Sequence, residues 1–310
     1  MEMKNCRTAY GESLVRLGAD DPNIVVLEAD LGKSTMSNLF GDAYPERYFQ
    51  MGIAEQNMAS VAAGLSLTGK TAIINSFAVF TSGRAYDQIR SSICIPNLNV
   101  KVCGSSAGLS DYGDGKTHQS IDDIALMRVL PHMTVLSPVD AVETEQMVNA
   151  MCKSKTPCYI RINRMDLPVY TSPDDEYHIG KMSKIREGKD VVVFASGVMV
   201  SQAVKAAELL EAEGISVRVV NVSTIKPLDT QALLGYCEGV KGVVTAEEHN
   251  VHGGLGSAIC EALSSSRLPI RMLGINDSFG RSAENYTLLL EYYHLMPEDV
   301  AEKVRRVLKD

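Results

Sequence analysis

An acidic residue stands at the start of a segment that is otherwise small and apolar, Met51-Gly-Ile-Ala-Glu-Gln-Asn-Met-Ala-Ser. Apart from Gln56 and Asn57, the residues after Glu55 predict a buried helix. The helix dipole stabilises a carboxylate in the first turn, and that structural role accounts for most such residues. A carboxylate in a dry site needs a partner, however, and it can share a proton with a heterocyclic nitrogen. Glu55 is therefore a candidate acid–base residue.

Two aromatic residues follow in Ser76-Phe-Ala-Val-Phe-Thr-Ser-Gly-Arg, where a strand is predicted to end before a helix. Ligands bind at the carboxyl ends of parallel strands, and an aromatic side chain there can stack on a flat ring. Phe77 and Phe80 are candidates for that role. The alternative is that both belong to the core, and for Phe77 taken alone the core is the favoured interpretation.

A glycine-rich turn, Gly113-Asp-Gly-Lys-Thr-His-Gln, carries Asp114 and His118. An isolated histidine is usually a surface or core residue. A histidine in such a loop beside an aspartate is a better candidate for substrate contact or proton transfer, since its charge changes near neutral pH.

The composition excludes several classes of protein. The net charge of −8 argues against a general nucleic-acid binder, which needs a basic face. No apolar run is long enough to cross a bilayer, and no hydrophobic segment follows the charges at the start, so a cytoplasmic location is expected. The seven cysteines are scattered without a C-x-x-C pair, which indicates reduced thiols rather than disulfides or zinc.

The elements that must position these residues alternate between strand and helix, which predicts an α/β fold with two domains of mostly parallel sheets flanked by helices. The expected domains are 1–166 and 190–310, joined by a linker at 167–189 that is rich in turn residues. The strands expected in the first domain are Asn23–Ala29, Ala72–Ser76, Leu98–Cys103, Thr134–Leu136 and Cys158–Ile162. Its expected helices are Arg7–Leu17, Ala54–Leu67, Arg84–Ile93, Ile121–Val129 and Ala141–Met151. The second domain is expected to hold the strands Val191–Ala195, Ser216–Val222 and Gly242–Ala246 and the helices Ser201–Glu213 and Pro297–Leu308.

The three chemical segments, in this order, resemble the pyrimidine-binding domain of transketolases. The resemblance continues through Arg161-Ile-Asn-Arg164. It extends into Thr224-Ile-Lys-Pro-Leu-Asp and Glu247-Glu-His-Asn-Val-His-Gly-Gly, which look like the transketolase C-terminal domain. It implies transfer of a two-carbon ketol unit from a ketose phosphate to an aldose, with thiamine diphosphate as the cofactor. In the family the C-terminal domain mainly serves folding and dimerisation. The resemblance implies no role for His249 or His252.

The resemblance also implies roles for cofactor-binding residues. Glu55 matches the glutamate that hydrogen-bonds the ring nitrogen opposite the 4′-amino group of the cofactor. Phe80 matches the aromatic residue that stacks on the pyrimidine, with Phe77 beside it. Asp30 matches an aspartate near the cofactor.

Substrate-binding residues follow from the same resemblance. His118 and Asp114 match residues that touch the hydroxyl groups of the sugar, which makes His118 a second candidate catalytic residue after Glu55. Arg7, Ser34 and Arg164 match residues that hold the terminal phosphate, a task that suits the planar donor fork of arginine.

One position departs from the family pattern. The family has a histidine two residues before the glycine of the Gly-Leu run, where this chain has Ser106. A smaller group on the floor of the pocket changes which ketose fits, so the usual pentose phosphates are in doubt. Ketol transfer is not excluded.

The chain lacks a recognisable Mg²⁺–diphosphate motif. Gly113-Asp-Gly115 matches its first part, but it precedes Thr117-His-Gln rather than following a buried strand, so we interpret it as the substrate loop. No metal ligands are therefore assigned to this chain. The resemblance begins near Arg7, where the pyrimidine domain begins in long transketolases. A split enzyme is thus expected, in which an N-terminal partner subunit supplies the Mg²⁺ site in an α2β2 assembly.

Other interpretations remain open. The β subunit of a 2-oxo acid dehydrogenase first component has the same plan and the same glutamate, and a transketolase-like enzyme for an unusual sugar is a further alternative. A deoxyxylulose-phosphate synthase fragment is less favoured. A non-catalytic homologue is disfavoured because Glu55, Phe80, Asp114 and His118 are all present.

Overall fold

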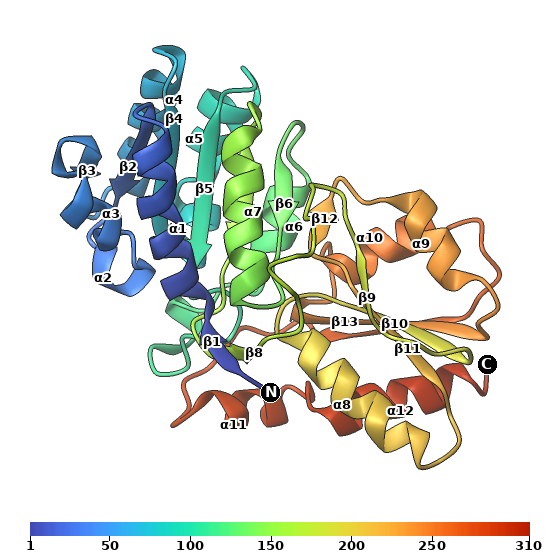
Figure 1. The fold of residues 1–310 in the computed structure, drawn as a ribbon. Helices are drawn as coiled ribbons and strands as arrows, with labels where there is room; N and C mark the ends of the chain where they lie inside the picture. Colours follow the sequence, from blue (N-terminus) through green and yellow to red (C-terminus); the bar gives the residue numbers. More distant parts are fainter.

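The computed structural model describes residues 1–310, and its strands form two large sheets that lie side by side (Figure 1). The first sheet has seven strands in the order β12 (Thr224–Lys226), β6 (Thr134–Leu136), β7 (Cys158–Arg161), β5 (Val100–Ser105), β4 (Thr71–Phe77), β2 (Ile24–Glu28) and β3 (Tyr48–Gln50). The second has five, in the order β14 (Ile270–Ile275), β13 (Gly242–Asn250), β10 (Val191–Ala195), β11 (Val217–Asn221) and β9 (Ser183–Arg186). A short antiparallel pair joins β1 (Met3–Asn5) to β8 (Asp166–Pro168).

Both faces of the first sheet are covered by helices, which explains why its strands are continuous apolar runs. Ile24 and Val26 of β2 pack in the same core cluster as α1 and α7, whereas Val25 and Leu27 pack in the cluster of α4 and α6. The helices of this half are α1 (Cys6–Asp20), α2 (Gly32–Thr35), α3 (Asn38–Ala43), α4 (Glu55–Leu67), α5 (Tyr86–Gln88), α6 (Asp123–Arg128) and α7 (Ala141–Lys153).

The second sheet is built in the same way. Val191 and Val193 of β10 pack with α8 and α12, and Val192 and Phe194 face α9 and α10. The core cluster on the α8 side is continuous with the cluster on the α1 side of the first sheet, so one apolar core runs through both halves. The helices here are α8 (Met199–Glu211), α9 (Thr230–Cys237), α10 (Leu255–Ala262), α11 (Tyr286–Tyr292) and α12 (Pro297–Val307).

One strand of the first sheet comes from the second half of the chain. β12 follows β11 in sequence, yet it pairs antiparallel with β6 (Figure 1). A backbone hydrogen bond of 2.8 Å from Ser137 N to Ser223 O extends the contact. The first sheet is therefore completed by residues that lie after the second sheet has begun.

The α/β fold with two mostly parallel sheets is confirmed, and Thr134–Leu136 and Val191–Ala195 form strands at the predicted residues. The prediction of a regular α-helix at Arg84–Ile93 is wrong. Its place is taken by π-helical segments at Phe80–Arg84 and Ile89–Cys94 on either side of α5. The wider π-helical turns change the direction of the side chains there, and a pattern based on 3.6 residues per turn does not predict that change.

The order of the strands defines where a ligand is expected. From β2 the chain moves outward to β3 and then returns to place β4 on the other side of β2, so the direction of winding reverses between β2 and β4. Because β2, β3, β4, β5 and β7 are all parallel, their carboxyl ends meet at one edge of the sheet. In open α/β sheets, ligands bind outside the carboxyl ends at such a switch point.

Candidate functional site

The predicted site residues follow the carboxyl ends of these five parallel strands. Asp30 and Ser34 follow β2, Glu55 follows β3, Phe77 ends β4 and Phe80 follows it, Ser106 and the loop to His118 follow β5, and Arg164 follows β7. The fold therefore gathers segments that are far apart in sequence at one edge of the first sheet.

Glu55 is the first residue of α4 and is buried, with 1% of its surface exposed. Its partner within the chain is Arg84, whose Nη1 donates to Oε1 at 2.9 Å and to Oε2 at 2.8 Å. The guanidinium of Arg84 also lies over the ring of Phe80, 4.5 Å from its centroid. Sequence reasoning expected a partner for this carboxylate but did not identify Arg84.

The expectation that α4 is buried holds for only one of its faces. Met58, Ala59 and Ala62 are fully buried, whereas Ser60 and Leu67 are exposed. The helix packs against β4 through one face, and its exposed face begins with Gln56 and Asn57 and continues with small and apolar residues. A run of small residues indicates close packing, but it does not show whether the packing partner belongs to the same chain.

Phe77, Phe80 and His118 form an aromatic group at the end of β4. The phenylalanine rings lie nearly parallel with their centroids 6.2 Å apart, and His118 meets Phe80 edge-on at 5.3 Å. Phe77 is 4% exposed, which confirms its core position, while Phe80 is half-buried and offers a ring face. The structure thus brings three predicted site residues into contact.

Arg7 and Arg164 form a second group, held together by Asn5. The Asn5 side chain caps α1 by accepting from Arg7 N at 3.0 Å, and its Nδ2 donates to Arg164 O at 3.1 Å. Arg7 Nη1 donates to the backbone oxygen of Ser34 at 2.8 Å. Burial lowers the pKa of Arg7, and the positive charge of Arg164 lowers it further, so the two guanidinium groups are close enough to repel each other.

Asp111 joins this group, and no spacing or motif had marked it in the sequence. Arg164 Nη1 lies 3.0 Å from Asp111 Oδ1, and the other carboxylate oxygen is buried without a hydrogen-bond partner. Burial raises the pKa of Asp111, and the guanidinium of Arg164 lowers it. The charges of Asp114 and His118 also act on Asp111, so the arginine group adjoins the substrate loop.

The remaining candidates, Asp30 and Ser106, make fewer contacts with the other predicted site residues. Asp30 is exposed at a positive φ of 62°, and its backbone N–H donates to Gln50 Oε1 at 2.9 Å. Ser106 is fully buried, at a φ of 52°, and its hydroxyl has no partner. No hydrogen bond or ion pair joins Asp30 or Ser106 to the groups around Glu55 or Arg164.

The edge of the sheet fits a planar, polar ligand. The hydroxyls of Ser76, Ser105 and Ser106 are buried without partners near the carboxyl ends of β4 and β5. Buried polar atoms are nearly always hydrogen-bonded in native structures, so orphaned hydroxyls point to a missing partner. At the same edge, the Glu55 carboxylate and the Phe80 ring provide a hydrogen-bonding group and a stacking face of the kind that an aminopyrimidine needs.

No cluster of three histidine, cysteine or acidic side chains lies close enough to hold a metal ion. Gly113 to Gly115 form a turn in which Gly115 has a φ of 73°, and a Cβ on Gly115 would lie 2.4 Å from the hydroxyl of Ser282. None of the helices is both long and apolar enough to span a bilayer.

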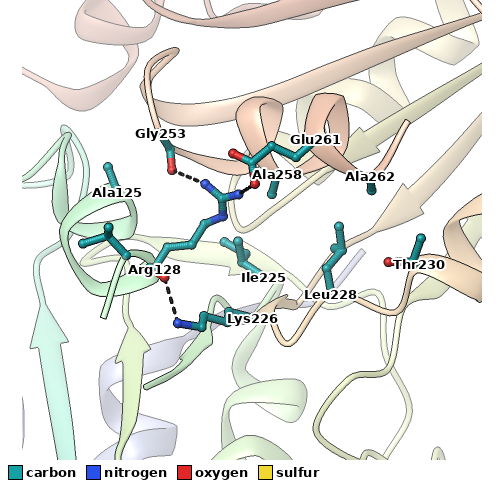
Figure 2. A pocket seen from close by; sticks show the side chains of 11 residues that line it. Ala125, Arg128, Ile225, Lys226, Leu228, Thr230, Gly253, Ala258, Glu261 and Ala262 are labelled. Atoms are coloured by element: carbon teal, nitrogen blue, oxygen red, sulfur yellow. Dashed lines mark hydrogen bonds and ion pairs between the residues drawn. The ribbon is translucent and has the colours of Figure 1, made fainter. Parts of the chain in front are cut away.

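A groove of about 650 Å³ lies between α6 and the second half of the chain and contains none of the predicted site residues. Figure 2 shows Arg128 reaching across it, where the guanidinium donates to Gly253 O at 3.1 Å and pairs with Glu261. Lys226 Nζ donates to the backbone oxygen of Arg128 at 2.9 Å. The groove is therefore part of the contact between the two halves, in which residues of the second half hold the end of α6.

Two family models match nearly the whole chain. The pyrimidine binding domain of transketolase matches residues 2–169, and the transketolase C-terminal domain matches residues 180–300. A putative transketolase C-terminal section of Methanocaldococcus jannaschii is 40% identical over 310 residues, which cover 99% of this chain and 97% of that protein. The 6-deoxy-6-sulfo-D-fructose transketolase subunit SqwH of Clostridium sp. is 40% identical over 275 residues, 88% of this chain and 85% of that protein.

Solved structures give the same result. A split gene transketolase, described as an inactive beta4 tetramer, superposes with a TM-score of 0.90 at 47% identity and covers 98% of both chains. A transketolase of Pichia stipitis superposes with a TM-score of 0.85 at 22% identity; all of this chain matches 46% of that one. Human transketolase is 34% identical over 309 residues, which are 97% of this chain and 49% of the human protein. The chain thus spans about half the length of these long transketolases.

Proposed function

This chain belongs to the transketolase family, and from that premise we propose that it is the C-terminal subunit of a split, thiamine diphosphate-dependent transketolase. The observation that carries the proposal is the placement of Glu55. Its buried carboxylate lies at the switch point of the first sheet, beside the half-exposed ring of Phe80. A carboxylate and an aromatic face at this place suit the ring nitrogen and the π-face of an aminopyrimidine.

The cofactor, when bound, supplies the carbanion chemistry of ketol transfer. In the proposal, Glu55 holds a proton at the pyrimidine ring nitrogen, and Phe80 orients the ring by stacking on it, with Phe77 behind. Asp30 lies at the end of the neighbouring strand β2 and is proposed as a further cofactor contact. Burial of Glu55 excludes water from the shared proton.

The sugar phosphate is proposed to bind across the second group of residues. Arg7 and Arg164 hold the terminal phosphate, since paired guanidinium groups satisfy several phosphate oxygens at once. Ser34 lies beside Arg7, which supports its assignment to the same subsite. His118 and Asp114 are proposed to contact the sugar hydroxyl groups, and His118 is the proposed group for proton exchange at the substrate. Ser106 is proposed to shape the floor of the pocket.

The partner is proposed to be an N-terminal transketolase subunit that carries the Mg²⁺ and diphosphate site, in an α2β2 assembly. The match to about half of the long transketolases and the likeness to a split gene transketolase support this. The relatives named for 6-deoxy-6-sulfo-D-fructose and for apulose-4-phosphate support a substrate other than the usual pentose phosphates, as the Ser106 departure does.

The test is reconstitution. The chain is co-expressed with an N-terminal transketolase subunit from the same genome, and ketol transfer is measured on a panel of ketose phosphates with and without thiamine diphosphate and Mg²⁺. We expect activity only when both subunits, the cofactor and the metal are present. Turnover by the isolated chain would contradict the split, and turnover of pyruvate instead of ketose phosphates would contradict the reaction type.

A further inference from the structure

The substrate loop, residues 108–121, is held by the second half of the chain near both of its ends. It carries Asp114 and His118, yet its anchors lie in β13 and in the segment before α11. Four hydrogen bonds make the attachment: Leu109 N to Glu248 Oε1 at 2.9 Å, Ala283 N to Tyr112 O at 2.9 Å, Gln119 Nε2 to Arg281 O at 2.9 Å, and Asn250 N to Ile121 O at 2.7 Å.

Glu248 is the side chain that accepts the hydrogen bond from Leu109 N–H at the start of this loop. It is fully enclosed, and its Oε1 also accepts from the hydroxyl of Tyr286 at 2.6 Å. Asn163 Nδ2 donates to Oε2 at 3.3 Å, and Arg161 Nη2 donates to the backbone oxygen of Glu248 at 2.8 Å. Burial raises the pKa of Glu248, and the nearby guanidinium of Arg161 lowers it. Such a satisfied buried network fixes one geometry rather than several.

The contact between Glu248 and the loop leaves no free space. Gly108 has a φ of 68°, and a Cβ there would lie 2.2 Å from Glu248 Oε2. The loop can therefore approach the carboxylate this closely only because residue 108 is glycine. Gly108 also pairs with Ser120 through an isolated bridge, so the two ends of the loop are held together at the point that Glu248 anchors.

We propose that Glu248 is a positioning residue of the active site. Through Leu109 N–H it fixes the start of the 108–121 loop, and so it sets the place of His118 against Phe80. The second domain thereby acts on the chemistry of the first, in addition to any role in assembly. The catalytic consequence rests on the proposed function, whereas the anchoring of the loop is a property of this chain alone.

The neighbouring residue provides a matched control. Glu247 lies on the same strand and is equally buried, but its carboxylate accepts from Leu255 N at 2.6 Å and from Gly256 N at 2.8 Å, both in α10. Truncating Glu247 removes a buried carboxylate from the second domain without removing a contact to the loop. It therefore separates general destabilisation from loss of the anchor.

The first experiment is amide hydrogen exchange on the full chain for Glu248→Ala, Glu248→Gln and Glu247→Ala. In Glu248→Ala we expect exchange of Leu109 and its loop neighbours to accelerate by about tenfold or more, since their local protection is lost. Glu248→Gln keeps an oxygen acceptor for Leu109 N–H and restores slow exchange. Unchanged loop exchange in Glu248→Ala, or equal acceleration in Glu247→Ala, overturns the proposal. If Glu248→Ala does not fold, Glu248→Asp draws the carboxylate back from Leu109 N–H by one methylene, and unchanged loop exchange in that variant overturns the proposal.

The second experiment uses the reconstituted enzyme. We expect Glu248→Ala to lower kcat/KM for the ketose phosphate by about tenfold or more, with thiamine diphosphate affinity within about twofold of the wild type and activity recovered in Glu248→Gln. Equal losses in Glu247→Ala overturn the catalytic part of the inference. If the wild-type pair shows no ketol transfer, the proposed function fails, and the exchange experiment still decides whether Glu248 anchors the loop.

Discussion

Arg84 donates from Nη1 to both carboxylate oxygens of Glu55 while its guanidinium lies over the ring of Phe80. One side chain thus engages both groups that we propose for the pyrimidine of the cofactor. In the proposed function an aminopyrimidine takes the same carboxylate and the same ring face, which requires Arg84 to turn aside. Its half-exposed side chain has room to do so.

Removing Arg84 should destabilise the isolated chain. In Arg84→Met the buried Glu55 carboxylate loses its only ion-pair partner, at a cost of about 1–3 kcal/mol in the free energy of unfolding. Urea denaturation measures the change, with Arg90→Met, an exposed arginine of the next turns, as the control. Adding Glu55→Gln to Arg84→Met should recover most of the loss. If Arg84→Met were as stable as the wild type, the ion pair between Arg84 and Glu55 would contribute nothing to the free energy of unfolding.

Glu55→Gln should inactivate the reconstituted enzyme without unfolding it. An amide cannot share its proton with the ring nitrogen in the same way, and loss of a positioned acid–base group costs about 10²–10⁴ in rate. We expect the loss in kcat, with KM for the ketose phosphate little changed. Steady-state kinetics on the purified pair measure both quantities. Glu238→Gln, at an exposed position of the second domain, is the control, and near-normal kcat in Glu55→Gln would refute the role of Glu55.

Arg164→Met should weaken binding of phosphorylated substrates selectively. A charge-assisted hydrogen bond contributes about 1.5–3 kcal/mol, so KM for a ketose phosphate should rise by about 10- to 100-fold. The same variant should change KM for the dephosphorylated sugar by less than about threefold. Arg267→Met, at an exposed position of the second domain, controls for the loss of one positive charge. Equal effects on both substrates would place the phosphate elsewhere.

Glu143 should make the stability of the chain depend on pH. Burial raises its pKa from 4.5 to about 7, although Val139 N donates to the carboxylate at 2.7 Å and Asn221 Nδ2 donates at 3.0 Å. Between these pKa values the folded state binds more protons than the unfolded state. The stabilisation is therefore fully present below pH 4.5 and is lost as the pH rises through about 7, by up to about 3 kcal/mol.

Urea denaturation at several pH values across this window tests that expectation. Glu143→Gln cannot ionise, so its free energy of unfolding should fall less between pH 5 and pH 8 than that of the wild type, by up to about 3 kcal/mol. Glu145→Gln, on the same helix but half-exposed and paired with Arg16, should keep the wild-type pH dependence. Parallel curves for Glu143→Gln and the wild type would assign the pH dependence to another group.

The parallel sheet that the sequence predicted explains why Phe77, Phe80 and His118 meet: Phe77 ends β4, Phe80 follows it, and His118 lies in the loop after β5. Once the strands were recognised, their carboxyl ends had to meet at one edge. The central strands and the long helices were predicted from the periodicity of their apolar residues, which is clearest in long segments. Glu55 was found from its contrast with an apolar neighbourhood, which is a local signal.

The contacts of Arg84, Asp111 and Glu248 could not be predicted in this way. Glu55 and Arg84 are separated by 29 positions, and Leu109 and Glu248 by 139. Which buried carboxylate meets which donor depends on the packing of whole elements, and no local pattern encodes that choice. β9 was missed because it lies in the turn-rich stretch that was predicted to be the linker, and β12 was missed because its three residues directly precede Pro227.

The return of β12 to the first sheet limits how this chain can be divided. A gene break between the two sheets would leave the first product with β6 as an unpaired edge strand and the second with a loose segment at Thr224–Lys226. Both products would also expose the apolar core that now runs through both halves. The two segments that match separate domain families therefore share one sheet and one apolar core, and we expect that neither folds without the other.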